Sequence, residues 1–278
     1  MPPQRLSPQA IETYRRTGYH FPVDVLSADE ARGYRRQLET FEARQGGPLK
    51  GELRHKSHLL FTWLNELIRD PRILDPVEDV LGRNLLCWSS SFFIKEPGDP
   101  GFVSWHQDST YWGLSSPDVM TVWVAFTPAD LVNGCMKFLP GSQQRQVGHR
   151  DTFDEHNLLT RGQEVEVEVN ERDAVCVALQ AGQASLHHVM LVHGSAPNRS
   201  NDRRIGYAIR YVPTHVRQIV GERDSATLVH GVDEYRNFDP EPRPAADCSP
   251  DALAAHAAIT QRQVKVLYRG TDAEAYRN

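Results

Sequence analysis

The amino-acid sequence predicts a mainly β protein with flanking α-helices, built as an antiparallel barrel or jelly roll. Hydrophobic residues recur at helical spacing over roughly the first eighty residues, and from about residue 84 they alternate with polar residues, as in strands. Glycine and proline pairs such as Pro140-Gly141 separate the alternating segments, and no long helical pattern lies between them. This order is typical of antiparallel barrels and not of a parallel sheet.

The N-terminal region carries clear helix-start signals. Ser7 followed by Pro8 predicts an N-cap with proline in the first helical turn. Ser27 and Glu30 form a capping box before a second helical pattern. We expect two further helices over 59–68 and 71–82, after an exposed glycine-rich loop at 44–52.

The middle of the chain predicts eight strands, and its end predicts one more helix. The expected strands cover 85–95, 103–108, 119–127, 135–139, 164–169, 174–179, 185–193 and 204–212. A proline-rich irregular segment then precedes a helix around 251–268. We therefore expect a single domain over 1–278, with helical support in 1–83, the β core in 84–215 and a C-terminal extension in 216–278.

Charge and cysteine content exclude several classes of function. Lys and Arg number 31 against 36 Asp and Glu, so no global positive field attracts nucleic acid or an anionic membrane. The four cysteines form no Cys-x-x-Cys pair, which argues against structural zinc and disulfides and favours a cytoplasmic location. The longest apolar run, 174–179, is far too short to span a bilayer. We expect a small-molecule partner, and the oligomeric state stays open.

A candidate metal site begins at Trp105-His106-Gln107-Asp108. Strand side chains alternate, so His106 and Asp108 would face the same side of the strand 103–108. His193, on a distant strand, would complete a set of two histidines and one carboxylate, which is characteristic of non-haem Fe(II) oxygenases. The His-x-Asp pair alone is weak support, because a simple ion pair has the same spacing.

The strand that follows His193 carries a further candidate residue. Arg204 follows His193 by eleven residues, and a turn at 197–202 brings the two segments side by side. A guanidinium on the inner face of that strand suits the remote carboxylate of a dicarboxylate cosubstrate, because it donates two parallel hydrogen bonds.

Three motifs in one order resemble the phytanoyl-CoA dioxygenase family of Fe(II)- and 2-oxoglutarate-dependent oxygenases. They are WHQDSTYW, VWVAFTPADLVNGCMKFLPGSQ and LVHGSAPNRSNDRRIGYAIRY, and the similarity covers roughly residues 10 to 220. The resemblance implies a double-stranded β-helix core. It also implies Fe(II) bound by His106, Asp108 and His193, and 2-oxoglutarate held through its C5 carboxylate by Arg204 with help from Ser195. Three further residues are implied to line the cosubstrate pocket: Trp123, Ser91 and Lys95. The sequence departs from the family at LPGSQ, where many relatives have LPGSH.

The resemblance implies hydroxylation of an unactivated C–H bond with O2, as 2-oxoglutarate is converted to succinate and CO2. Related halogenases replace the carboxylate ligand so that chloride binds, and Asp108 fills that position here. Desaturation, epoxidation or ring formation on the same centre is an alternative outcome. A non-catalytic metal- or 2-oxoglutarate-binding module and a cupin-like isomerase are alternatives of other classes. The expected substrate is a small polar metabolite or a natural-product intermediate.

Several neighbours of the motifs are candidates for the substrate pocket, each with a plain structural alternative. His187 is either a pocket donor or a hydrogen-bonded structural histidine, and Arg210 either binds an anionic substrate group or pairs with a buried carboxylate. Tyr111 and Trp112 follow the metal motif and either cover the substrate or pack in the core. The basic cluster at 54–58 is either part of a lid or a solvated turn.

Overall fold

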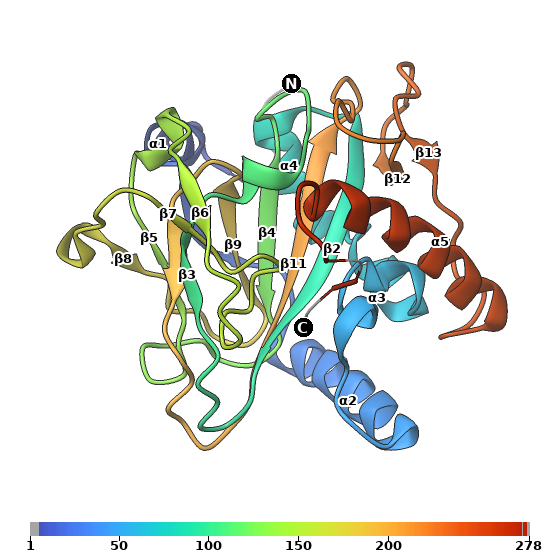
Figure 1. The fold of residues 1–278 in the computed structure, drawn as a ribbon, viewed down its shortest axis with the longest axis horizontal. Coiled ribbons are helices and arrows are strands. Elements are labelled where there is room, and N and C mark those ends of the chain that lie inside the picture. Colours follow the sequence, from blue (N-terminus) through green and yellow to red (C-terminus); the bar gives the residue numbers. More distant parts are fainter. Residues whose placement is uncertain (1–5, 274, 277–278) are drawn as a thin grey trace.

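The computed structural model describes residues 6–273 and 275–276, and over these residues two β-sheets stand face to face (Figure 1). The larger sheet has seven strands. In spatial order they are β1 (Tyr19–Asp24), β9 (Gln183–His188), β4 (Met120–Ala125), β11 (Arg204–Pro213), β2 (Leu85–Lys95), β12 (Ser225–His230) and β13 (Asp239–Pro240). All neighbours in this sheet are antiparallel except β12 and β13.

The smaller sheet closes the other side of the sandwich. Its spatial order is β3 (Val103–His106), β10 (His193–Ser195), β5 (Met136–Phe138) and β8 (Val175–Cys176). A separate two-stranded ribbon, β6 (His149–Asp151) and β7 (Gln163–Val165), lies beside it. Two facing sheets with helices outside confirm the predicted jelly roll.

Helices cover the outer face of the larger sheet and one end of the molecule. They are α1 (Pro8–Thr17), α2 (Ala28–Gln45), α3 (Thr62–Leu67), α4 (Pro71–Leu81) and α5 (Pro250–Leu267), and α5 crosses in front of β2 (Figure 1). Both predicted caps form: the Ser7 side chain accepts from the backbone N–H of Ala10, and Ser27 and Glu30 make the two reciprocal bonds of a capping box. Among the described helices none is long and apolar enough to cross a membrane.

Side-chain alternation along β11 separates the structural core from the interior of the sandwich. Ile205, Tyr207, Ile209 and Tyr211 face outward and pack with residues of α2, α3 and α4 in the main hydrophobic core. The intervening residues face inward, between the sheets, and include Arg204 and Arg210. The buried outer face stabilises the strand, so the inner face is free to carry polar groups.

The inner face of β11 is shaped by one glycine. Gly206 pairs with Ala125 of β4, and the indole of the neighbouring Trp123 lies over it. A Cβ atom at position 206 would lie 1.7 Å from Cζ2 of Trp123. The absence of a side chain at Gly206 therefore fixes where the Trp123 ring enters the interior.

The structure differs from the sequence-based expectation at several strands. β1 lies within the N-terminal region expected to be helical, and β12 lies in the expected irregular extension. The strand expected over 185–193 is two strands in different sheets, because the chain turns after His188, where the Leu191 N–H donates to the His188 carbonyl. β3 ends at His106, and Asp108 begins a short 3-10 helix, Asp108–Tyr111.

A buried ionic cluster ties the N-terminal region to the C-terminal extension. The side chains of Lys56 and Glu241 form an ion pair with no exposed surface on either partner. His58 contacts the same carboxylate at 3.1 Å, and Thr227 on β12 donates to it at 2.7 Å. Desolvation disfavours such charges, so each depends on the other. The basic cluster at 54–58 is therefore neither a lid nor a solvated turn at Lys56 and His58.

Replacing Lys56 with methionine should lower the free energy of unfolding by about 3–5 kcal/mol, because Glu241 would be left charged and buried. Urea unfolding followed by circular dichroism measures this loss. Lys137→Met is the matched control: the Lys137–Glu171 pair is partly exposed, and its loss should cost about 1 kcal/mol or less. Equal losses in the two variants would contradict the role assigned to the buried pair.

Gly206→Ala should destabilise the protein by about 3 kcal/mol, since the new methyl group must displace the Trp123 ring. A double-mutant cycle in denaturant tests the cause: in a Trp123→Ala background most of the cost should disappear. Gly47→Ala is the control, because a Cβ there would meet no atom within 4 Å. A cost that is the same in both backgrounds would mean that Gly206 acts through something other than the indole.

Candidate active site

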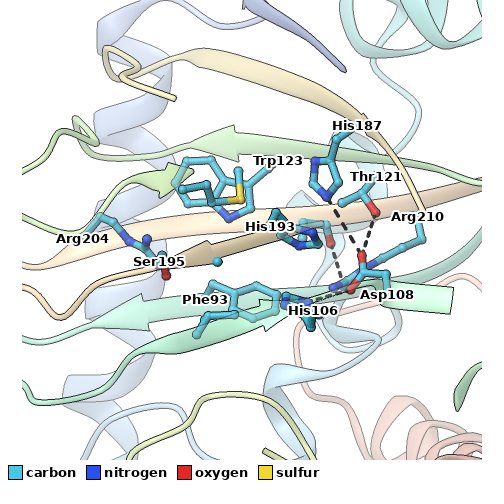
Figure 2. Close-up of a pocket in the computed structure, with 14 residues that line it drawn as sticks. Phe93, His106, Asp108, Thr121, Trp123, His187, His193, Ser195, Arg204 and Arg210 are labelled. Carbon is cyan, nitrogen blue, oxygen red and sulfur yellow. Dashed lines mark hydrogen bonds and ion pairs between the residues drawn. The ribbon is translucent and has the colours of Figure 1, made fainter. Parts of the chain in front are cut away.

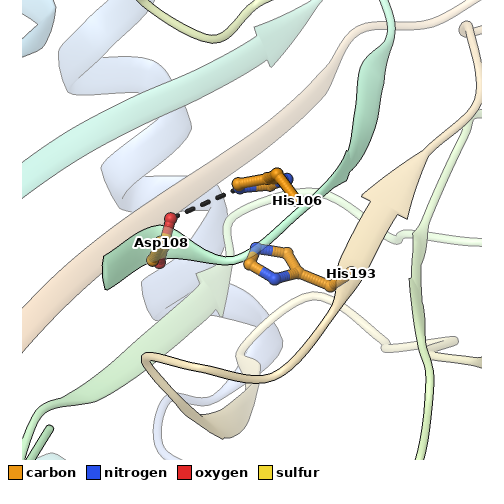
Figure 3. Close-up of side chains that lie close together, drawn as sticks. All are labelled: His106, Asp108 and His193. Carbon is orange, nitrogen blue, oxygen red and sulfur yellow. Dashed lines mark ion pairs between the residues drawn. The ribbon is translucent and has the colours of Figure 1, made fainter. Parts of the chain in front are cut away.

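Two histidines and an aspartate converge between the sheets (Figure 3). His106 ends β3, Asp108 begins the 3-10 helix that follows, and His193 begins β10. His106 and His193 are directly paired in the antiparallel register of the two strands, and their ring centroids are 4.1 Å apart. One potential ligand atom from each of the three residues lies within 4.8 Å of the others, and all three side chains are buried. The structure therefore brings together the three residues predicted from the motif.

Hydrogen bonds fix the orientation of both imidazoles. Nδ1 of His106 lies 2.9 Å from the Ser104 carbonyl, and Nδ1 of His193 lies 2.9 Å from the Leu191 carbonyl. A carbonyl only accepts, so each Nδ1 carries the proton, and each Nε2 keeps a lone pair. Nε2 of His106 lies 3.3 Å from Oδ1 of Asp108. This tautomer is the one in which a metal-binding histidine presents Nε2.

Charge and burial keep Asp108 and His193 in ligand form. Burial raises the pKa of Asp108, but its contact with His106 and the neighbouring positive groups, Arg210 among them, outweigh burial and lower that pKa. Burial lowers the pKa of His193 to about 4, with a further contribution from His106. A carboxylate and a neutral imidazole are the forms that bind a cation.

The donor set fits ferrous iron. Two imidazole nitrogens and one carboxylate on one side leave the opposite coordination positions open for other ligands. Thr121 on β4 donates to Oδ2 of Asp108 at 3.3 Å, which holds the carboxylate in place while Oδ1 faces His106. Outer hydrogen bonds of this kind orient metal ligands in proteins.

A cavity of about 30 Å³ extends from this cluster toward Arg204 (Figure 2). The Arg204 guanidinium is buried and donates to the Gly134 carbonyl at 2.6 Å, and its Nε has no hydrogen-bond partner. Trp123 lies beside it, with its ring centroid 5.3 Å from the guanidinium carbon. A buried donor without an acceptor carries a free-energy cost, so this end of the cavity suits an anion.

Lys95 and Ser195 lie at the same end. Nζ of Lys95 donates to Oγ of Ser195 at 2.6 Å and also contacts the Ala196 carbonyl. Burial, followed by the charge of Arg204, lowers the pKa of Lys95 to about 6. Ser195 lines the cavity itself, whereas Lys95 reaches it through the serine. Because Lys95 satisfies the serine oxygen, the Ser195 hydroxyl proton is free to donate to a ligand.

His187 is the third histidine at the cluster. It lies on β9 of the larger sheet, and its Nε2 is 4.0 Å from Oδ2 of Asp108. Both of its ring nitrogens are buried without a hydrogen-bond partner. The alternative of a hydrogen-bonded structural histidine is therefore not what the structure shows. His187 and His193 lie on strands of opposite sheets and point toward each other across the interior. They do not face the same way by alternation along one strand, as a single strand over 185–193 would require.

A second cavity, of about 70 Å³, adjoins the first and shares Phe93, Asp108 and Arg210 with it. Ser91 and Trp112 line this second cavity, so the structure places Ser91 away from the Arg204 end. Its other walls include Ser89, His55 and Tyr276.

Tyr111 lines neither of the two cavities. Its hydroxyl donates to Asp151 at 2.6 Å, and the Arg161 guanidinium lies over its ring.

Sequence reasoning missed several lining residues. Thr121 precedes Trp123 by two positions on β4, so alternation along the strand predicts that both side chains face the interior. Met136 had no distinguishing signal beyond a place in an expected strand. Tyr276 stacks on His55 with ring centroids 3.8 Å apart, and nothing in the local sequence indicates that this distant residue returns to the site.

Comparison with known sequences gives one family. A model of the phytanoyl-CoA dioxygenase (PhyH) family matches residues 3–206. The chain is 32% identical over 177 residues to the probable alpha-ketoglutarate-dependent hypophosphite dioxygenase of Stutzerimonas stutzeri, covering 60% of this chain and 61% of that protein. It is 24% identical to the L-proline trans-4-hydroxylase of Streptomyces griseoviridis, covering 78% of this chain and 92% of that enzyme. The chain thus matches less than two thirds of the first relative's length.

Solved structures agree with the sequence comparison. The non-heme monooxygenase ThoJ, in its apo form, is 33% identical with a TM-score of 0.83 over 93% of this chain and 97% of that one. CytC3 with Fe(II) and alpha-ketoglutarate (2-oxoglutarate) is 28% identical with a TM-score of 0.65, over 88% of this chain and 97% of that one. The family match spans both histidines, the aspartate and Arg204. On these grounds the chain belongs to the phytanoyl-CoA dioxygenase family, and its fold and donor set are those of a 2-oxoglutarate-dependent iron oxygenase.

Proposed function

We propose that the protein is an Fe(II)- and 2-oxoglutarate-dependent dioxygenase that hydroxylates an unactivated C–H bond of a small polar metabolite or natural-product intermediate. One observation carries the proposal. A cluster of two Nε2 lone pairs and a carboxylate lies at one end of a cavity whose other end is a buried arginine with an unpartnered donor. A metal-chelating dicarboxylate is the kind of ligand that would satisfy both ends.

His106, Asp108 and His193 would hold the iron, and Arg204 would bind the C5 carboxylate of 2-oxoglutarate. Ser195 would donate a further hydrogen bond to that carboxylate. The negative charge of the bound carboxylate would raise the pKa of Lys95, which burial lowers in the empty site. Bound ferrous iron, with 2-oxoglutarate and O2, supplies the oxidising power that inserts one oxygen atom into the C–H bond as succinate and CO2 are formed.

The chain's own residues would then orient the reactants and keep water out. Trp123, Met136 and Phe93 form apolar walls around the cavity, and all three ligand side chains are buried. A dry, preorganised site strengthens the electrostatic interactions within it and suppresses side reactions. His187, with both nitrogens free, would be available as a hydrogen-bond donor to a bound ligand.

Oxygen insertion is favoured over other outcomes. Asp108 fills the coordination position that halogenation would need, and relatives are named as a dioxygenase, a hydroxylase and a monooxygenase. Desaturation, epoxidation or ring formation would use the same residues. We also propose a cytoplasmic location, which the four free cysteine thiols favour.

Asp108→Ala should abolish Fe(II)-dependent conversion of 2-oxoglutarate to succinate, to below about one hundredth of the wild-type rate, because the iron loses one of its three protein ligands. Succinate assay and anaerobic Fe(II) titration are the two measurements. Asp118→Ala, which removes a partly exposed carboxylate that contacts His215, is the control and should keep both properties.

Unchanged turnover in Asp108→Ala would overturn the assignment of the iron ligands. A wild-type protein that binds iron and 2-oxoglutarate but never forms succinate would be the non-catalytic module. Turnover of a substrate without O2 or 2-oxoglutarate would instead support the isomerase alternative.

Arg204→Gln should raise the KM for 2-oxoglutarate by about 10- to 100-fold, since one charge-assisted contact to the C5 carboxylate is lost. Arg204→Lys should lose less, because it keeps the charge without the paired donors. Arg203→Gln is the matched control: its guanidinium pairs with Glu42 and Glu96, so its loss should affect stability and leave this KM unchanged. An unchanged KM in Arg204→Gln would mean that another group binds the cosubstrate.

A further inference from the structure

Two arginines project from the same strand toward opposite sides of the metal cluster. Arg204 and Arg210 both lie on β11 and face the interior, about 20 Å apart along the strand. Figure 2 shows Arg204 at one side of the cluster and Arg210 at the other, beside Asp108. A single 2-oxoglutarate bound between the iron and Arg204 leaves Arg210 with no anionic neighbour other than Asp108, which would itself bind the iron. Arg210 therefore needs its own explanation.

Arg210 lacks the ion pair that buried Lys56 has. It is 6% exposed, its Nε has no hydrogen-bond partner, and the hydrogen bond from its guanidinium to the Ala208 carbonyl is long, at 3.5 Å. Among the described residues it forms no ion pair, and the buried carboxylate whose charge acts on it is Asp108, which is also a proposed metal ligand. By contrast, buried Lys56 is paired with Glu241. An unpaired buried guanidinium is costly and is a recurrent feature of anion-binding sites.

The second cavity, which we name the Arg210 chamber, has the chemistry to hold such a ligand. It adjoins the metal cluster through Asp108 and is lined by Arg210, Ser89, Ser91, Trp112 and Tyr276. The Arg210 guanidinium carbon lies 5.6 Å from the ring centroid of Phe93 and 5.7 Å from that of Trp112. Aromatic walls suit an apolar body, while the guanidinium and two serine hydroxyls suit an anionic head.

We propose that the substrate is a small organic anion, a carboxylate or a phosphonate, whose head group is bound by Arg210 in this chamber. The proposal rests on the proposed function, since it assigns the substrate of the same iron centre. Binding the head group beside Asp108 would set which carbon of the substrate faces the iron. Arg210 would thus be a specificity-determining residue.

The test measures binding and does not depend on turnover. The protein loaded with Fe(II) and saturating 2-oxoglutarate, without O2, is titrated calorimetrically with phenylacetate, with its neutral isostere phenylacetamide, and with methylphosphonate. At least one anion should bind about tenfold or more tightly than the amide, as expected for a charge-assisted buried contact. The carboxylate and phosphonate arms show which head group the chamber prefers.

Arg210→Gln should remove the preference for the anion, and Arg210→Lys should keep part of it, because lysine retains the charge without the planar fork. Arg69→Gln is the matched control: Arg69 donates to Asn65 on α3, outside the chamber, and its loss should leave the preference unchanged. Circular dichroism checks folding, and Arg210→Lys decides the question if Arg210→Gln does not fold.

Three results would overturn the inference: no anion binding better than the amide, a preference that survives in Arg210→Gln, or an anion that competes with 2-oxoglutarate. Failure of the proposed function looks different, because the wild-type protein would then neither bind iron and 2-oxoglutarate nor form succinate. In that case the same titration on the protein without iron still decides whether Arg210 binds anions.

Discussion

The pairing of β10 with β3 is the constraint on which the rest of the site depends. It sets His193 opposite His106, and the short turn after His106 returns Asp108 to the same point. Side chains alternate along strands, so a slip of one residue in this register would turn one histidine out of the interior. The carbonyls of Ser104 and Leu191 then orient the two rings, which means that backbone geometry alone prepares both lone pairs.

The larger sheet carries the poorly paired polar side chains of the interior, because its outer face is stabilised by packing against helices. Its outer face is packed against helices through residues such as Tyr207 and Ile209, so its inner face tolerates two arginines and a histidine that are poorly paired. Unpaired buried groups destabilise a fold, and they persist where the surrounding core is extensive. In this protein the hydrophobic core between the larger sheet and the helices offsets the free-energy cost of the unpartnered polar groups in the interior.

Much of the fold and of the site could be predicted from the sequence, for identifiable reasons. Helix caps are local, so those at Ser7 and Ser27 could be predicted from the sequence. The spacing of His106, Asp108, His193 and Arg204 is likewise a pattern that the sequence displays directly. The turn between β9 and β10 was hidden, because 185–193 contains no glycine or proline to mark it and the chain's change of sheet is a tertiary event. The contribution of Tyr276 was equally hidden, since a contact across more than two hundred residues leaves no local pattern.

The composition of the Arg210 chamber has a consequence for how such enzymes diverge. The family model ends at residue 206, whereas Arg210, Gln263 and Tyr276 of the chamber wall all lie beyond it. The proposed substrate chamber thus combines residues inside the family match, such as Ser89 and Trp112, with residues that follow it. A substitution at Gln263 or Tyr276 would alter the wall of the proposed chamber without touching His106, Asp108 or His193, so the shape of the chamber can change independently of the metal site.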